Sequence, residues 1–212
     1  MRSLEFERYA GQAARAVAIM GFLYSVLFVI VVERAPRWAE IVTSLLLLGG
    51  ALLSTVAFVA LYARLHLIDP LASLWATLLG FAAAIGSAMH GAYDLGILIK
   101  TPAAFSTEVP NPTDPRGLAT FALGGVAILA FSWLMARSAE FPETLIRIGY
   151  GAAALLLVTY LGRLIFLNPK NPVVAVAAVA AGFVFSPVWW AWVGSELLDG
   201  ATPTHGQPPP VL

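Results

Sequence analysis

Charged residues are scarce in this sequence, and cysteine is absent. Asp, Glu, Lys and Arg make up 11% of the 212 residues, whereas a typical globular domain carries about 25%. Without cysteine the chain forms no disulfide and has no thiol nucleophile. The 12 basic and 12 acidic residues give a formal net charge of zero, so no basic field indicates a nucleic-acid partner. This composition excludes an ordinary soluble domain.

Catalytic motifs are missing as well. The sequence contains no Ser-x-x-Lys, Gly-x-Ser-x-Gly or His-Glu-x-x-His pattern and no paired intramembrane aspartates, so intramembrane proteolysis and metal-dependent hydrolysis have no support. The glycine pairs follow no strand pattern, which argues against a phosphate-binding loop. We therefore predict no catalytic residue and no metal site, and we leave the cofactor unknown.

Six long hydrophobic runs fill most of the chain, of which 59% is hydrophobic. About 20 apolar residues cross a ~30 Å hydrocarbon core, and lipid requires backbone polar groups to be satisfied within a helix. We predict an all-α polytopic membrane protein, with one six-transmembrane-helix bundle over residues 1–198 and a disordered tail over 199–212. The predicted spans cover residues 13–32, 38–63, 71–99, 117–136, 144–166 and 173–198.

Three boundaries between spans pair a capping side chain with proline: Asp69-Pro70, Asp114-Pro115 and Asn171-Pro172. Asp or Asn accepts a hydrogen bond from a free N–H of the first helical turn, and proline fits the first helical position because no partner is lost there. These pairs predict three helix starts.

The Lys and Arg count does not decide the orientation, because the two sides of the predicted bundle carry six each. The first helix usually dominates, and its N-terminal side is the richer one. The long proline-rich loop over residues 100–116 suits the outer face. We therefore predict that both termini are cytoplasmic.

Polar residues inside a span are costly and indicate function by default. Ser87, His90 and Asp94 fall at i, i+3 and i+7, on one face of the third predicted helix. A His four residues before an Asp can hydrogen-bond to it, and the pair can relay a proton or coordinate an ion. The fifth predicted helix offers an ion-pair partner for Asp94 at the same depth. The candidate intramembrane polar site consists of Ser87, His90, Tyr93, Asp94, Tyr160 and Arg163. The alternative is that these groups reach the outer interface or are simply packed.

A second group of polar residues lies at the cytoplasmic helix ends. It comprises Arg64, His66, Arg137, Glu143, Arg147 and Glu196. This candidate cytoplasmic-rim cluster binds a partner on one interpretation and is a solvated rim on the other. Trp189, Trp190 and Trp192 are interpreted as an interfacial aromatic belt.

The histidines do not favour a bis-histidine haem site. Two axial ligands must lie at one depth, whereas His66 falls at one end of the second predicted helix and His90 falls in the outer half of the third. The sequence does not exclude a haem with a single axial histidine.

The segment from the fourth to the fifth predicted helix, Trp133-Leu-Met-Ala-Arg-Ser-Ala-Glu-Phe-Pro142, resembles a bacterial family of six-helix integral membrane proteins of unknown function. The start, Ala13-Ala14-Arg15 followed by Gly21-Phe22-Leu23-Tyr24, is similar to the opening of that family. So is the close of the second helix, from Ala60 to Leu65. The resemblance implies a six-helix topology and a bacterial inner (plasma) membrane, and it carries no functional residues.

Two functions of different classes follow. In the first, the protein binds or transports a small solute, an ion or a lipid through the polar site in the bundle. In the second, it is a non-catalytic membrane subunit or sensor that packs against a protein partner, and the short loops favour this view. A redox protein and an intramembrane enzyme come after both. The predicted partners are the lipid bilayer and either a protein or a second copy of the chain, without nucleic acid.

Overall fold

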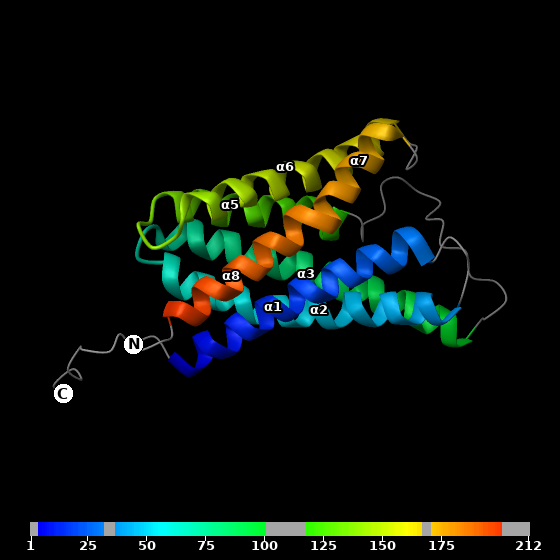
Figure 1. The fold of residues 1–212 in the computed structure, drawn as a ribbon, viewed down its shortest axis with the longest axis horizontal. Coiled ribbons are helices and arrows are strands. Elements are labelled where there is room, and N and C mark those ends of the chain that lie inside the picture. The colour runs from blue at the N-terminus through cyan, green and yellow to red at the C-terminus, as the bar shows by residue number, and fades with distance from the viewer. Residues whose placement is uncertain (1–3, 32–36, 101–117, 167–170, 201–212) are drawn as a thin grey trace.

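A computed structural model describes residues 4–31, 37–100, 118–166 and 171–200, and every element in these ranges is a helix (Figure 1). The all-α prediction is therefore confirmed. The elements are the α-helices α1 (Leu4–Val26), α2 (Arg37–Leu65), α3 (Pro70–Lys100), α5 (Gly124–Ala136), α6 (Glu143–Phe166), α7 (Pro172–Ala180) and α8 (Ser186–Gly200), together with the π-helical segments η1 (Leu27–Val31), η3 (Leu118–Leu123) and η4 (Ala181–Phe185).

Five of the helical segments are long and apolar enough to cross a membrane: Leu4–Ile30, Arg37–Leu65, Pro70–Lys100, Glu143–Phe166 and Pro172–Gly200. The sixth predicted span is present as a shorter apolar helix, Thr120–Ala136. Large hydrophobic side chains such as Ile19, Leu71, Met89 and Ile165 are exposed along the bundle, as expected for surfaces that face lipid. The count of six membrane passages stays a prediction.

The predicted span boundaries agree with most helix ends to within two residues, with one clear exception. α1 begins at Leu4, well before the predicted start at residue 13. The charged residues of this segment indicated a position outside the membrane, yet Glu7 is buried inside the bundle. At the other end of the chain, α8 continues through Gly200, so the first two residues of the predicted tail are helical. The rest of that tail lies outside the described residues.

Two of the three predicted helix starts are confirmed. The Ala72 N–H donates to Asp69 Oδ1 at 3.0 Å, and the Val173 N–H donates to Asn171 Oδ1 at 3.0 Å. Each bond satisfies a free N–H of a first helical turn. The third start, at Asp114-Pro115, lies outside the described residues.

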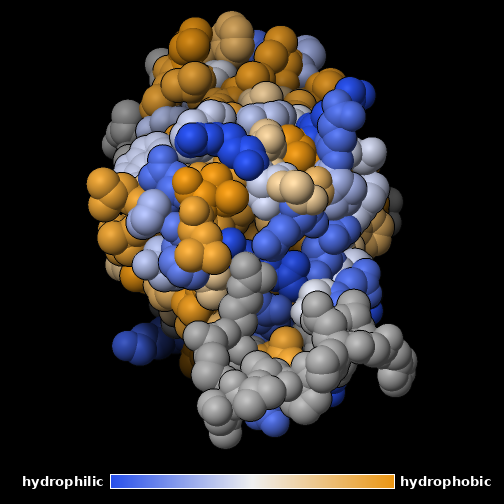
Figure 2. Space-filling view, turned by 90° about the vertical axis from the view of Figure 1, so that its left-hand side faces the viewer, coloured by the Kyte–Doolittle hydropathy of each residue, from blue (hydrophilic) through white to orange (hydrophobic). Residues whose placement is uncertain are grey.

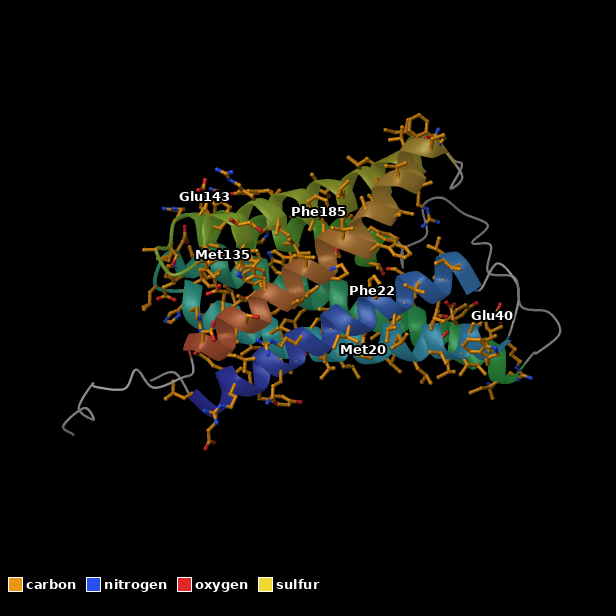
Figure 3. The ribbon with its side chains drawn as sticks, viewed as in Figure 1. Met20, Phe22, Glu40, Met135, Glu143 and Phe185 are labelled. Carbon is orange, nitrogen blue, oxygen red and sulfur yellow. The ribbon has the colours of Figure 1, made fainter. Side chains whose placement is uncertain are left out.

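The helices form one elongated bundle with two ends (Figure 1). α1 begins and α8 ends at the same end, where α2 meets α3 and α5 meets α6; we call it the terminal end, and the other the opposite end. α2 packs most extensively against α3, α1 packs against α8 and α2, and α5 packs against α6 and α3. Near the middle of the bundle, η4 joins α7 to α8, and Phe185 lies against Gly151 of α6 (Figure 3).

Glycine sets the closest helix crossings. A Cβ on Gly194 of α8 would lie 2.7 Å from the Gly11 carbonyl oxygen, and a Cβ on Gly11 would lie 2.8 Å from the Gly194 carbonyl oxygen. A Cβ on Gly91 of α3 would lie 2.6 Å from the Ser44 carbonyl oxygen of α2. Only glycine allows backbones to approach this closely, which is the usual basis of tight helix packing in membranes.

An aromatic cluster fills the core on the terminal side of the bundle centre. Phe58 stacks on Phe131 with ring centroids 5.6 Å apart, Trp190 meets Phe58 edge-on at 5.3 Å, and Trp189 meets Trp190 at 4.9 Å. Trp189 is fully buried and Trp190 is 9% exposed. The prediction that these tryptophans form an interfacial belt is wrong for both, because α8 turns them toward the core.

Three other tryptophans have the positions expected of an interfacial belt. Trp38 at the start of α2 is exposed, and so are Trp75 near the start of α3 and Trp133 near the end of α5. Trp38 lies at the opposite end, and the other two lie near the terminal end. At 1.5 Å per residue, roughly 33 Å separates the two levels, close to the ~30 Å of a hydrocarbon core.

Candidate functional site: a hydroxyl-lined cavity and its polar neighbours

A cavity of about 190 Å³ lies in the middle of the bundle, between α1, α2, α3, η3, α5, α6 and α8. Much of its wall is apolar and is built by residues such as Val17, Leu47, Ile128 and Leu156. The glycines and alanines in the wall leave this space because they carry little or no side chain. The cavity is thus a direct result of the small residues that these helices share.

Five hydroxyl-bearing residues also line the cavity, and they come from five different elements: Tyr24, Ser54, Ser87, Thr120 and Ser186. Ser54 Oγ donates to the Ala51 carbonyl at 2.7 Å, so its own oxygen can still accept a bond. Ser87 Oγ donates to Thr120 Oγ1 at 3.4 Å, a long bond that leaves both groups free to reorient. The lining residues include no charged side chain.

The cavity is closed toward the terminal end and open on one side. Phe58 and Trp190, two members of the aromatic cluster, form part of its lining. Gly21 of α1 also lines it and is exposed, and a Cβ there would meet no atom within 4 Å. The entrance therefore runs past Gly21, because glycine leaves this position of α1 without a side chain.

Three π-helical segments adjoin this cavity. η3 contributes Thr120, η4 directly precedes Ser186, and η1 begins three residues after Tyr24. A π-helical turn shifts the register of side chains and is frequent at functional sites. In this bundle η3 contains one of the hydroxyl-bearing lining residues, and η1 and η4 lie close in sequence to two others.

The predicted pair of His90 and Asp94 is confirmed. His90 Nε2 lies 3.1 Å from Asp94 Oδ2, and the two side chains are 23% and 25% exposed. The pair follows Ser87 on the same face of α3, toward the opposite end. His90 Nδ1 is buried and has no hydrogen-bond partner among the described residues.

The remaining members of the predicted intramembrane site differ from one another in how far they are exposed. Tyr93 is 59% exposed, so most of its side chain lies on the surface of the bundle. Tyr160 and Arg163 of α6 are half-buried. α5 and η3 pack against both α3 and α6. Tyr24 lies within electrostatic range of both Asp94 and Arg163. A direct ion pair between them stays a prediction.

The six residues of the predicted cytoplasmic-rim cluster all lie near the terminal end, which Figure 2 shows face-on with hydrophilic side chains gathered on it. They form separate contacts. Arg137 lies 3.6 Å from Asp69 and over the Trp133 ring, Arg147 pairs with the exposed Glu143 on α6 (Figure 3), and Trp192 Nε1 donates to Glu196 at 3.0 Å.

His66 Nδ1 lies 2.9 Å from the Ala63 carbonyl oxygen, within its own helix end. These local contacts support the interpretation of the terminal end as a solvated rim. Arg64 is the exception to it.

Arg64 and Glu7 form a buried ion pair near the terminal end. Arg64 Nη2 donates to Glu7 Oε2 at 3.1 Å and to the Leu197 carbonyl oxygen at 3.3 Å, so that α2, α1 and α8 are joined. The side chains are 5% and 3% exposed. Glu7 Oε1 and Arg64 Nε have no partner among the described residues, so breaking the pair would leave a buried charge with almost no compensation.

No group of three His, Asp or Glu residues that could hold a metal ion occurs in the part of the chain that the structure describes. His66 lies at the terminal end, and His90 lies about 30 Å along α3 from that end at 1.5 Å per residue. One haem cannot be ligated by both.

Sequence reasoning missed four of the five cavity hydroxyls and the partner of Arg64. Tyr24, Ser54, Thr120 and Ser186 are single polar residues in apolar helices, where serine and threonine usually bond to their own backbone. A signal was present only in the depth of three of them, because Tyr24, Ser54 and Ser186 fall near the middle of their predicted spans, whereas Thr120 falls near the start of its span. Depth alone does not tell which helices are neighbours.

Comparison with known proteins found no matching family model, curated protein or solved structure. The resemblance to the bacterial six-helix family therefore stays a prediction.

Proposed function

We propose that this protein is a membrane protein that binds a small uncharged solute in the central cavity. The observation that carries the proposal is the chemistry of the cavity wall, which combines five hydroxyl-bearing residues with apolar side chains and no charge. Apolar walls with a few placed polar groups are typical of small-molecule sites. A charged solute would lose its hydration there without a partner.

The size of the cavity restricts the solute. An apolar cavity of about 150 Å³ holds benzene, so the cavity of about 190 Å³ suits a molecule slightly larger than benzene. The hydroxyls suit one or two hydrogen-bonding groups on that molecule. Small aromatic or cyclic alcohols and carbonyl compounds fit both requirements.

The aromatic cluster favours binding over free passage in this conformation. Phe58 and Trp190 lie between the cavity and the terminal end. Passage of a solute would require these rings to separate, which is a movement of packed helices and not of a loop. Transport is thus an extension of the binding function, and it needs a second conformation.

We further propose six membrane passages, with η3 and α5 as the fourth. An even number of passages supports this count, because α1 begins and α8 ends at the same end of the bundle (Figure 1). A bacterial inner membrane with cytoplasmic termini is the setting that the sequence favours.

Binding is tested by ¹⁹F NMR titration of 4-fluorobenzyl alcohol into the purified protein in detergent. Gly21→Leu places a side chain at the entrance, where its Cβ meets nothing within 4 Å. We expect this variant to bind the probe at least about tenfold more weakly, equivalent to ~1.4 kcal/mol.

Gly96→Leu is the matched control. Gly96 is also an exposed helical glycine with nothing within 4 Å of a Cβ, and it does not line the cavity. The probe partitions into detergent to the same extent in both samples. A difference in affinity between the two variants therefore measures binding in the cavity. Equal affinity in the two variants, or no saturable binding in the wild type, would overturn the proposal. Purification with a fixed second polypeptide and no probe binding would favour the subunit function.

A further inference from the structure

His90 is held with one ring nitrogen paired and the other unused. Nε2 lies 3.1 Å from Asp94 Oδ2, while Nδ1 is buried without a partner among the described residues. A neutral ring that donates from Nε2 leaves only a lone pair on Nδ1. A protonated ring would place a second N–H there, and a buried donor without an acceptor is costly.

The unused nitrogen belongs to a residue close to the proposed solute site. Ser87 lines the cavity and precedes His90 by three residues, so the two side chains lie on one face of α3. A solute that occupies the cavity with its oxygen toward the opposite end would extend along this face. That oxygen is the acceptor that a protonated Nδ1 lacks.

We propose that His90 binds a proton together with the solute, so that the protein takes up one proton with each solute that carries an oxygen acceptor. The proton comes from water at the opposite end, toward which Asp94 follows His90 along α3. It adds to the lone pair of Nδ1, Asp94 keeps its bond to Nε2, and the solute oxygen accepts from Nδ1. This inference rests on the proposed function of the cavity.

Charged side chains on three helices have to be considered around the pair. On α3 Asp94 contacts His90. On α2 Glu40 lies one turn before Ser44, whose carbonyl packs on Gly91, and Arg37 donates to the Leu98 carbonyl of α3. Arg163 lies on α6. Tyr24 of α1 lines the cavity and lies within electrostatic range of both Asp94 and Arg163. The described part of η3 and α5 carries no titratable side chain.

The direction of the effect follows from this chemistry. Because the bound solute stabilises the protonated ring, the protonated ring must bind the solute more tightly by the same factor. Histidine changes charge between about pH 5 and 8. We therefore expect 4-fluorobenzyl alcohol to bind at least about fivefold more tightly near pH 5 than near pH 8, within the usual range of coupling between two sites.

The experiment repeats the ¹⁹F titration across this pH range for the wild type, His90→Gln and His66→Gln. Glutamine keeps a polar side chain of similar length but takes up no proton, so His90→Gln is expected to bind the probe with no dependence on pH. His66→Gln is the matched control at the terminal end and is expected to keep the wild-type dependence. Asp94→Asn is measured alongside, and we expect it to move the midpoint of the pH dependence downward because the imidazolium loses its carboxylate.

The outcomes separate the two proposals. Saturable binding that does not vary with pH in the wild type would overturn proton coupling and leave the cavity function standing. A pH dependence that persists unchanged in His90→Gln and Asp94→Asn would assign the proton to another group, and this too would overturn the inference. Absence of binding at every pH would overturn the cavity function itself.

Discussion

Replacing Glu7 by alanine is expected to lower the free energy of unfolding by about 3–5 kcal/mol, the usual cost of removing one partner of a buried ion pair. The Arg64 side chain is 5% exposed, and without Glu7 it would keep its hydrogen bond to the uncharged Leu197 carbonyl but lose its counter-charge. Gly200 packs directly against the guanidinium, so the arginine has little room to turn toward water. The loss of stability would affect α1, α2 and α8 together, because the ion pair joins these three helices.

The measurement is a reversible unfolding titration in SDS that compares three proteins with the wild type. The double variant Glu7→Leu/Arg64→Met removes both charges and is expected to regain most of the lost stability, because apolar replacement of a whole buried pair is often neutral or stabilising. Glu143→Ala is the matched control, since its partner Arg147 is exposed and such pairs contribute little. If Glu7→Ala were as stable as Glu143→Ala, the burial of this pair would be contradicted.

Gly194→Ala is expected to lower the free energy of unfolding by about 1–3 kcal/mol through overpacking. The new methyl group would lie 2.7 Å from the Gly11 carbonyl oxygen and 3.0 Å from the Arg15 backbone nitrogen. These are backbone atoms of α1, so no rotamer change relieves the clash and the two helices must separate. The contact of Arg15 Nη2 with Ser195 Oγ, now 3.1 Å, would be lost as well.

The sign of this effect makes it diagnostic. In the interior of a helix, alanine is normally more stable than glycine by about 1 kcal/mol. Gly21→Ala and Gly96→Ala, where a Cβ meets nothing within 4 Å, are therefore expected to gain stability or stay unchanged. The same SDS titration measures all three variants. A gain for Gly194→Ala would contradict the close crossing of α1 and α8.

The features that sequence predicted well are those set by local chemistry. Apolar runs required helices because lipid offers no partner to a free backbone group, and Asp69 and Asn171 mark helix starts through bonds to nearby N–H groups. The pairing of His90 with Asp94 follows from four-residue spacing alone. Each of these needs only a few consecutive residues.

The features that sequence did not predict depend on which helices are neighbours. Glu7 looked like an interfacial charge because its partner, Arg64, is distant in the chain and lies on another helix. Trp189 and Trp190 looked like an interfacial belt because composition does not fix the rotation of α8. The cavity is formed by residues from seven elements, and each of these residues is unremarkable within its own helix.

The central claim is that a small neutral solute occupies the cavity between Ser87, Thr120 and Trp190, and one measurement tests it most directly. An experimental structure with 4-bromobenzyl alcohol would locate the bromine by its anomalous scattering. We expect a single strong peak inside the cavity of the wild type, and its loss in Gly21→Leu but not in Gly96→Leu. Bromine found only on the lipid-facing surface, with the cavity unchanged, would contradict the account.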